Sequence, residues 1–151
     1  MVIPSETDTV TIRVAQYGDA PVLVDLLAQL GYPQTLVVVE QMLQRSAADR
    51  TQIVFVAEYE QQVVGFAALV KLYYFHRHED MARLSSLVVN EAHRSHRIGE
   101  QLLQAAEQWA RQQQCKVLEL ASNVKRVDAH RFYERLGYNK TGWRLWKAIA
   151  E

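Results

Sequence analysis

The fold is decided by the stretch Leu84-Ser-Ser-Leu-Val-Val-Asn-Glu-Ala-His-Arg-Ser-His-Arg-Ile-Gly-Glu-Gln-Leu-Leu-Gln-Ala-Ala-Glu-Gln-Trp-Ala110. Its short core, Leu87-Val88-Val89, is continuous and β-branched, which is typical of a buried strand. A polar, basic turn follows from Asn90 to Arg97. Apolar residues then recur at helical spacing, which predicts a helix with one apolar face: Ile98, Leu102, Ala105, Ala106 and Trp109.

A strand, a basic turn and a helix in this order predict an anion site. The first backbone N–H groups of a helix have no partner inside the helix, and the helix dipole places positive charge at them. Gly99 allows the backbone to approach a ligand closely, and Arg94, His96 and Arg97 surround the turn with donors. We interpret the turn as the binding site for the pyrophosphate of a bulky cofactor.

Residues 94–99, Arg-Ser-His-Arg-Ile-Gly, resemble the acetyl-CoA loop of the GNAT family of N-acetyltransferases, usually written Arg-Gly-x-Gly-Ile-Gly. Arg94, Ile98 and Gly99 match that pattern. Ser95 and Arg97 stand where glycines are usual, and such a replacement is tolerable only if those positions keep φ below zero. We therefore expect a negative φ at both.

A second segment, Leu118 to Tyr138, resembles the GNAT pattern Asn-x-x-Arg-x-x-Ala-x-x-Phe-Tyr-x-x-x-Gly-Phe/Tyr. The residues that match in spacing are Asn123, Arg126, Ala129, Phe132, Tyr133, Gly137 and Tyr138. Within the family, the segment is most similar to the aminoalkylphosphonate and small-amine N-acetyltransferases. The two motifs together cover roughly the C-terminal half of the chain.

The resemblance implies acetyl-CoA as cosubstrate and a set of residues that hold it. The N–H of Val89 would serve the oxyanion, Asn123 would bond the pantetheine arm, and the phenol of Tyr133 would protonate the departing sulfur. The full set of implied cofactor-binding residues is Leu87, Val88, Val89, Arg94, Ser95, His96, Arg97, Ile98, Gly99, Glu100, Asn123, Arg126, Ala129, Phe132 and Tyr133.

The general base is less well marked by the sequence. Many relatives carry a carboxylate on the strand before the loop, where this chain has Arg83 and Ser86. Glu79 is our first candidate, and a water relay or an amine that arrives neutral are the alternatives. The other nearby candidates are Asp80, His76 and His78. His76 and His78 have ligand-like spacing, but an exposed loop pair is the simpler interpretation, and no metal is expected.

The remaining pattern predicts one α/β domain over residues 1–151, with a mixed, twisted central sheet and helices on both faces. Gly65 marks a bulge or a close approach, and Thr35 is expected to cap a helix. Strands are predicted at 9–15, 53–59, 63–72, 87–89, 117–121 and within 138–151, with 73–80 as strand end plus loop. Helices are predicted at 20–30, 36–45, 98–110 and 128–136.

Composition limits the class of protein. The 151 residues carry no formal net charge, so the molecule as a whole has no field that attracts nucleic acid or an anionic membrane. The single cysteine excludes an intramolecular disulfide, and no signal peptide or membrane-spanning run is visible. We expect a cytoplasmic protein.

Three functions follow as hypotheses. The first is transfer of an acetyl group from acetyl-CoA to a primary amine of a small molecule, by direct attack in a ternary complex. The second is acetylation of a protein N-terminus or lysine, and the third is a non-catalytic acyl-CoA-binding module. Dimers are common in the GNAT family, so a homodimer stays open.

Overall fold

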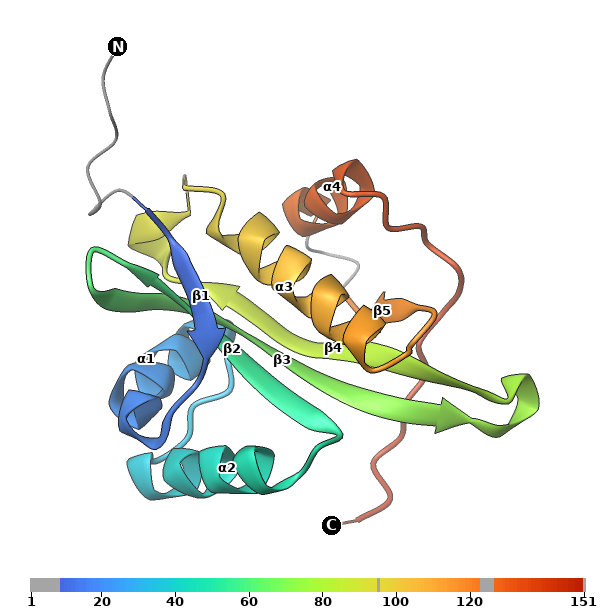
Figure 1. The fold of residues 1–151 in the computed structure, drawn as a ribbon, viewed down its shortest axis with the longest axis horizontal. Coiled ribbons are helices and arrows are strands. Elements are labelled where there is room, and N and C mark those ends of the chain that lie inside the picture. The colour runs from blue at the N-terminus through green and yellow to red at the C-terminus, as the bar shows by residue number, and fades with distance from the viewer. Residues whose placement is uncertain (1–8, 95, 123–126, 151) are drawn as a thin grey trace. The chain divides into compact units, whose positions relative to one another are not determined.

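The computed structural model of the chain describes residues 9–94, 96–122 and 127–150. The chain divides into two compact units, residues 1–119 and residues 120–151. Figure 1 shows the elements in chain order. The strands are β1 (Thr11–Val14), β2 (Gln52–Tyr59), β3 (Gln62–Tyr74), β4 (Glu79–Val89) and β5 (Leu118–Leu120). The α-helices are α1 (Ala20–Leu30), α2 (Leu36–Ala48), α3 (Ile98–Gln112) and α4 (Val127–Arg135), and short 3-10 helices are η2 (Tyr17–Asp19), η3 (Phe75–Arg77) and η4 (Glu91–His93).

The five strands form one sheet in the order β1-β2-β3-β4-β5. The pairings from β1 to β4 are antiparallel. Helix α3 connects β4 to β5, the kind of crossover that parallel neighbours require, and the N–H of Ala82 donates to the carbonyl oxygen of Val117 at 2.9 Å. The predicted mixed α/β sheet is therefore confirmed.

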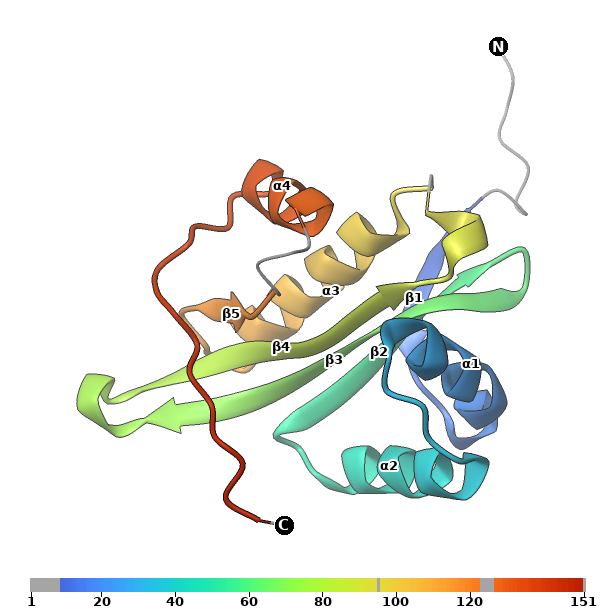
Figure 2. The ribbon, with the colours of Figure 1, turned by 180° about the vertical axis from the view of Figure 1, so that it is seen from behind.

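Helices of the first unit cover both faces of the sheet, as Figures 1 and 2 show. On one face, Phe66 and Val88 join a buried core with Leu26 of α1 and Val39 of α2. On the other face, Gly65 lies against side chains of α3. Adjacent strand residues point to opposite faces, so the neighbours Gly65 and Phe66 serve the two layers separately.

The start of α2 shows how capping overrides local propensity. Residues 36–39, Leu-Val-Val-Val, would suit a strand, but the Thr35 hydroxyl accepts a hydrogen bond from the N–H of Val38 at 3.3 Å and begins the helix. Val39 and Leu43, one helical turn apart, are then buried together. The predicted helix is confirmed and runs three residues further than expected, to Ala48.

Two of the sequence-based boundaries are wrong. Strands β3 and β4 form a long hairpin, because β3 continues to Tyr74 and β4 already begins at Glu79. Of the segment 73–80, predicted as strand end plus loop, residues 73, 74, 79 and 80 are paired strand, and the short η3 turn and His78 lie between them. The strand predicted within 138–151 is absent from the described residues 138–150: an apolar pattern forms a strand only where a neighbouring strand supplies hydrogen bonds.

Gly65 has both of the features expected of it. The register of β2 and β3 shifts beside it, between Ala57 and Glu58. A Cβ at Gly65 would lie 2.9 Å from the carbonyl oxygen of Val88 and 3.3 Å from Leu102. Strand β4, which leads into the basic turn, therefore packs closely against the backbone of Gly65 on β3.

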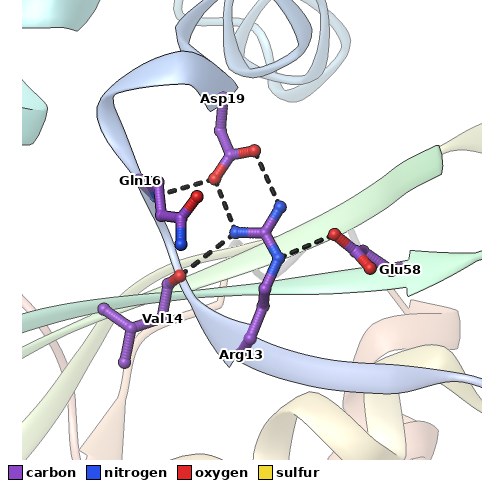
Figure 3. A network of polar contacts seen from close by, with 5 residues as sticks. All are labelled: Arg13, Val14, Gln16, Asp19 and Glu58. Carbon is purple, nitrogen blue, oxygen red and sulfur yellow. Dashed lines mark hydrogen bonds and ion pairs between the residues drawn. The ribbon is translucent and has the colours of Figure 1, made fainter. Parts of the chain in front are cut away.

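A network of polar side chains surrounds Arg13 on β1 (Figure 3). The guanidinium of Arg13 on β1 makes two hydrogen bonds to the Asp19 carboxylate, at 2.8 and 2.9 Å, and a third to Glu58 on β2 at 2.7 Å. Asp19 also accepts from the backbone N–H of Gln16 at 2.7 Å. These contacts join β1, β2 and the start of α1, and the hydrogen bonds from Arg13 hold the pKa of Asp19 below its usual range.

The substitution Asp19→Asn is expected to lower the free energy of unfolding by about 2 kcal/mol at pH 7. Asp19 is largely buried, and its replacement by a neutral amide leaves the guanidinium of Arg13 without this carboxylate partner. A depressed carboxyl pKa contributes stability above the ordinary value of about 3.9 and loses it as the pH falls toward the folded-state value. The difference from wild type should therefore shrink in acid. Urea unfolding at pH 7 and below pH 4 measures this, with the exposed Asp25→Asn as control. A difference that does not change with pH would contradict the assignment.

Candidate cofactor and active site

The loop between β4 and α3 is built from short local hydrogen bonds. The N–H of Asn90 donates to the carbonyl oxygen of Val64 at 2.7 Å, which fixes the loop to β3 where β4 ends. The Asn90 side chain then accepts from the N–H of Ala92 at 3.0 Å and begins η4. The chain reaches α3 through Arg94, His96 and Arg97, whose side chains are all exposed.

The N-terminus of α3 presents donors without a side-chain cap. Its N-cap residue is Arg97, whose guanidinium carries only donors, and no side-chain capping bond forms there among the described residues. The N–H of Gln101 makes the first helical bond, to the carbonyl oxygen of Arg97 at 3.1 Å. The amides of Ile98, Gly99 and Glu100 precede it, so they are the groups that an anion at this helix end would meet.

Arg97 corrects one expectation. Its φ is +57°, in the left-handed region, although we expected a negative φ at this non-glycine position. A side chain in that conformation costs about 1 kcal/mol relative to glycine. The loop therefore keeps the backbone geometry for which glycine is suited while adding a guanidinium. Ser95, the other position in question, lies outside the described residues.

On β4, the predicted residues alternate between the two faces. Val88 is buried in the core with α1 and α2, whereas Leu87 and Val89 are partly exposed. Val89 ends the strand directly before the loop. An oxyanion donor at Val89 stays a prediction.

The position of Glu79 argues against its proposed role as base. Glu79 and Val89 are the two ends of an eleven-residue strand, which at about 3.3 Å per residue spans about 33 Å. If the carbonyl is held at Val89, as the family resemblance implies, a carboxylate at the other end of the strand is too far away to take a proton from the attacking amine. Glu79 instead pairs with Arg77 at 2.5 Å, beside the hairpin turn.

The other base candidates lie at that same end. Asp80 pairs with Lys71 at 3.5 Å, and Nδ1 of His78 lies 2.8 Å from the Tyr73 hydroxyl. His76 lies in η3, and its ring stacks on that of Tyr74 with the centroids 5.9 Å apart. No group of three potential metal ligands occurs among the residues that the structure describes.

Arg83 belongs to a network that the sequence did not indicate. Its Nε and Nη2 donate to Oε1 of Glu119 on β5, at 2.9 and 2.7 Å, and Nη2 also lies 2.7 Å from the Tyr74 hydroxyl. Tyr74 donates to the same carboxylate oxygen, and this bond raises the pKa of Tyr74 above its usual value. Three neighbouring strands are thus joined at the position where many relatives are expected to have a carboxylate.

The second unit presents the other motif on α4. The rings of Phe132 and Tyr133 meet edge to face at 5.3 Å, and Tyr138 lies 6.0 Å from Tyr133. The backbone turns after the helix at Gly137, with φ +94°, and the N–H of Tyr138 returns to the carbonyl oxygen of Tyr133 at 3.0 Å. Tyr133 is therefore held among rings of its own unit, with its side chain half-buried.

Comparison with known families decides what this combination is. The model of the acetyltransferase (GNAT) family matches residues 23–138, which include both motifs. The chain belongs to the GNAT family. The resemblance drawn from residues 94–99 and 118–138 is confirmed, and with it the N-acetyltransferase family.

Known proteins add detail to the GNAT assignment. An aminoalkylphosphonate N-acetyltransferase of Salmonella typhimurium is 41% identical over 88 residues, which are 58% of this chain and 57% of that relative. The match thus spans a little over half the length of the curated relative. A Bacillus halodurans protein described as a transcriptional regulator superposes with a TM-score of 0.85 at 25% identity, over 93% of this chain and 100% of that one. An aminoglycoside N-acetyltransferase in complex with CoA shares the fold, with a TM-score of 0.84 at 15% identity, over 93% and 94%.

The site residues of the GNAT motifs fall into two groups. The structure places Arg94, His96, Arg97 and the start of α3 together at one end of the sheet in the first unit. Ala129, Phe132 and Tyr133 lie together on α4 in the second unit. Asn123 and Arg126 lie outside the described residues, so their predicted contacts stay predictions.

Tyr59, which no sequence motif indicated, contacts this GNAT loop with its ring. Tyr59 ends β2, and its ring stacks on His96 with the centroids 4.6 Å apart. No motif includes Tyr59, because the contact joins segments far apart in the chain. A tyrosine directly before a tight hairpin turn was the only available signal.

Within residues 9–94, 96–122 and 127–150, no helix combines the length and apolar composition that a membrane span requires.

Proposed function

We propose that this protein transfers the acetyl group of acetyl-CoA to a primary amine of a small molecule, by direct attack in a ternary complex. The observation that carries the proposal is the N-terminus of α3, where the N-cap residue is an arginine and Arg94 lies in the same loop. Such a helix end offers backbone amides and guanidinium groups to a pyrophosphate without a competing side-chain cap. Family membership supports the same cosubstrate.

The chemistry assigns tasks to residues of both motifs. The acceptor must lose a proton before it attacks, since a free alkyl ammonium has a pKa of about 10.4. The attack forms the C–N bond, and the carbonyl oxygen becomes an oxyanion that the N–H of Val89 would stabilise. Collapse of this intermediate breaks the C–S bond, and Tyr133 would protonate the thiolate. Asn123 would hold the pantetheine arm, as the family resemblance implies.

In place of Glu79 as general base, we propose a simpler route for deprotonating the acceptor amine. Glu79, Asp80 and His78 all lie near the hairpin turn, at the end of β4 remote from Val89. We therefore favour proton loss to water, either directly or through a relay, or an acceptor that arrives as the neutral amine. This route predicts a rate that rises with pH until the acceptor amine is deprotonated.

The curated relative supports one class of acceptor. That protein is named for aminoalkylphosphonates, and its alignment with this chain covers 57% of its length at 41% identity. Aminoalkylphosphonates are small molecules that carry a primary amine and an anionic group. We propose that acceptors of this class are used here, with other small primary amines as second choice.

The function is tested by two measurements on the same preparation. Calorimetry with coenzyme A is expected to show binding, and Arg94→Ala should raise the Kd about tenfold through loss of a charge-assisted hydrogen bond. Arg45→Ala, at the exposed end of α2, serves as the matched control and should leave the Kd unchanged.

Release of free thiol from acetyl-CoA is then followed with a panel of acceptors. The panel contains aminoalkylphosphonates, polyamines, aminoglycosides, amino acids and peptides with free N-termini. Release with a small amine supports the proposal, whereas release with peptides alone would make the protein a peptide acetyltransferase. Binding without release from any acceptor would indicate an acyl-CoA-binding module, and absence of binding would overturn the proposal.

A further inference from the structure

Three rings gather beside the basic loop. The ring of Tyr59 stacks on His96, with centroids 4.6 Å apart and planes 26° from parallel. It also meets the edge of His93 at 5.8 Å and 68°, and the two imidazoles lie 6.4 Å apart. We refer to Tyr59, His93 and His96 as the loop cluster.

Tyr59 stands on a rigid support. It ends β2 and pairs with Gln62 of β3 across a two-residue turn. Both turn residues have positive φ, +51° at Glu60 and +63° at Gln61, which is the backbone of a tight hairpin matched to strand twist. The backbone that carries the ring is therefore held by strand pairing on one side and a tight turn on the other.

The first half of the loop is fixed to β3 by the hydrogen bond from the N–H of Asn90 to the carbonyl oxygen of Val64. The N–H of His93 donates to the carbonyl oxygen of Asn90 at 2.9 Å, and the N–H of Gln101 donates to the carbonyl oxygen of Arg97 at 3.1 Å in the first turn of α3. Arg97 itself is held at φ +57°, where glycine would be relaxed. His96 directly precedes Arg97, so the stack on Tyr59 restrains the chain at the strained position.

Resting on the proposed function, we propose that Tyr59 is a positioning residue for the cofactor loop: its ring holds His96, and thereby fixes the Arg97 backbone that presents the donors of α3 to pyrophosphate. The tyrosine touches neither the acetyl group nor the acceptor. A glycine at position 97 would let the loop adopt this shape without strain. Here the contact between Tyr59 and His96 compensates for the absence of that glycine. Its action should therefore be confined to the part of the carrier that bears phosphate.

The positioning role of Tyr59 can be distinguished from general damage to the fold by comparing two acetyl donors. S-acetylpantetheine has the same thioester and arm as acetyl-CoA but lacks the pyrophosphate. In Tyr59→Ala, kcat/KM for acetyl-CoA is expected to fall about tenfold through loss of the stacked pair. The value for S-acetylpantetheine, kcat at saturating acetyl-CoA, and KM for the amine should stay at the wild-type level.

Two further variants keep the result interpretable. Tyr59→Phe retains the ring and should restore the preference for acetyl-CoA, because the stack needs no hydroxyl. Tyr73→Ala is the matched control: Tyr73 also contacts a histidine, His78, with ring centroids 6.0 Å apart, but on the distant β3–β4 hairpin. It should leave both substrates unaffected.

The outcomes separate this inference from the proposed function. Equal losses with both substrates in Tyr59→Ala, or an unchanged preference for acetyl-CoA, would overturn the positioning role while leaving the acetyltransferase intact. If Tyr59→Ala fails to fold, Tyr59→Leu, which keeps an apolar contact without a stacking ring, takes its place under the same expectations. A wild-type protein that binds no coenzyme A would overturn both proposals together.

Discussion

Substituting alanine for Gly65 is expected to lower the free energy of unfolding by about 2 to 3 kcal/mol. The added Cβ would lie 2.9 Å from the carbonyl oxygen of Val88, a backbone atom of β4 that cannot rotate away. It would also lie 3.3 Å from Leu102 of α3, which is fully buried. The strand pair or the helix must therefore shift.

The direction of the effect is diagnostic. Glycine within a strand is ordinarily worse than alanine by about 0.5 to 1 kcal/mol, so an unremarkable site would become more stable. Thermal unfolding should show a decrease in Tm of roughly 5 to 10 °C for a chain of this size. Gly18→Ala is the control, because a Cβ there has no atom within 4 Å, and it should leave the Tm equal or higher. A stabilised Gly65→Ala protein would refute the close approach.

The same substitution should also weaken the cofactor site. Val88 directly precedes Val89, the proposed oxyanion donor, and the N–H of Asn90 bonds to Val64, the neighbour of Gly65. A shift of β4 at this position moves the strand end from which the loop departs. Stability and coenzyme A affinity should therefore fall together in Gly65→Ala, whereas Asp19→Asn should change stability alone.

The second large effect is expected at Tyr133. Tyr133→Phe should reduce kcat about a hundredfold, the usual size of a general-acid contribution, if the phenol protonates the departing thiolate. The ring contacts with Phe132 and Tyr138 need no hydroxyl, so KM for acetyl-CoA should change little. Steady-state kinetics with saturating amine separates the two parameters.

Tyr138→Phe provides the matched control for this experiment. It removes a hydroxyl from the neighbouring ring of the same unit and leaves the Tyr133 hydroxyl in place. Its kcat should stay within about twofold of wild type. An unchanged kcat in Tyr133→Phe would show that the thiolate leaves without help from that phenol, and the acid role would have to be withdrawn.

Sequence periodicity was sufficient where one element carries its own signal. Helix α3 was predicted from its buried stripe, and the helix begins at Ile98 as expected. Thr35 correctly predicted the start of α2 in spite of three consecutive valines, because a cap acts locally on the first turn. The resemblance of residues 94–99 and 118–138 correctly gave the family.

What failed depended on partners that the sequence does not name. Strand β4 was predicted only over Leu87–Val89, since the polar residues before it become strand through pairing with the long β3. Glu79 was named as base for its nearness in sequence to the loop, and the extended strand separates it from Val89, so the identity of the base stays a proposal. The positive φ of Arg97 was missed because it belongs to a loop whose contacts, such as the stacking of Tyr59 on His96, join segments far apart in the chain.

The lone sulfhydryl of the chain has a practical consequence. Cys115 is buried, and burial raises the pKa of its thiol, so at neutral pH it stays protonated and shielded from electrophilic dyes. A chromogenic disulfide reagent added to native protein should therefore report only the coenzyme liberated by turnover. The same reagent, applied in denaturant, would count one equivalent per chain and so calibrate the concentration of enzyme in the cuvette.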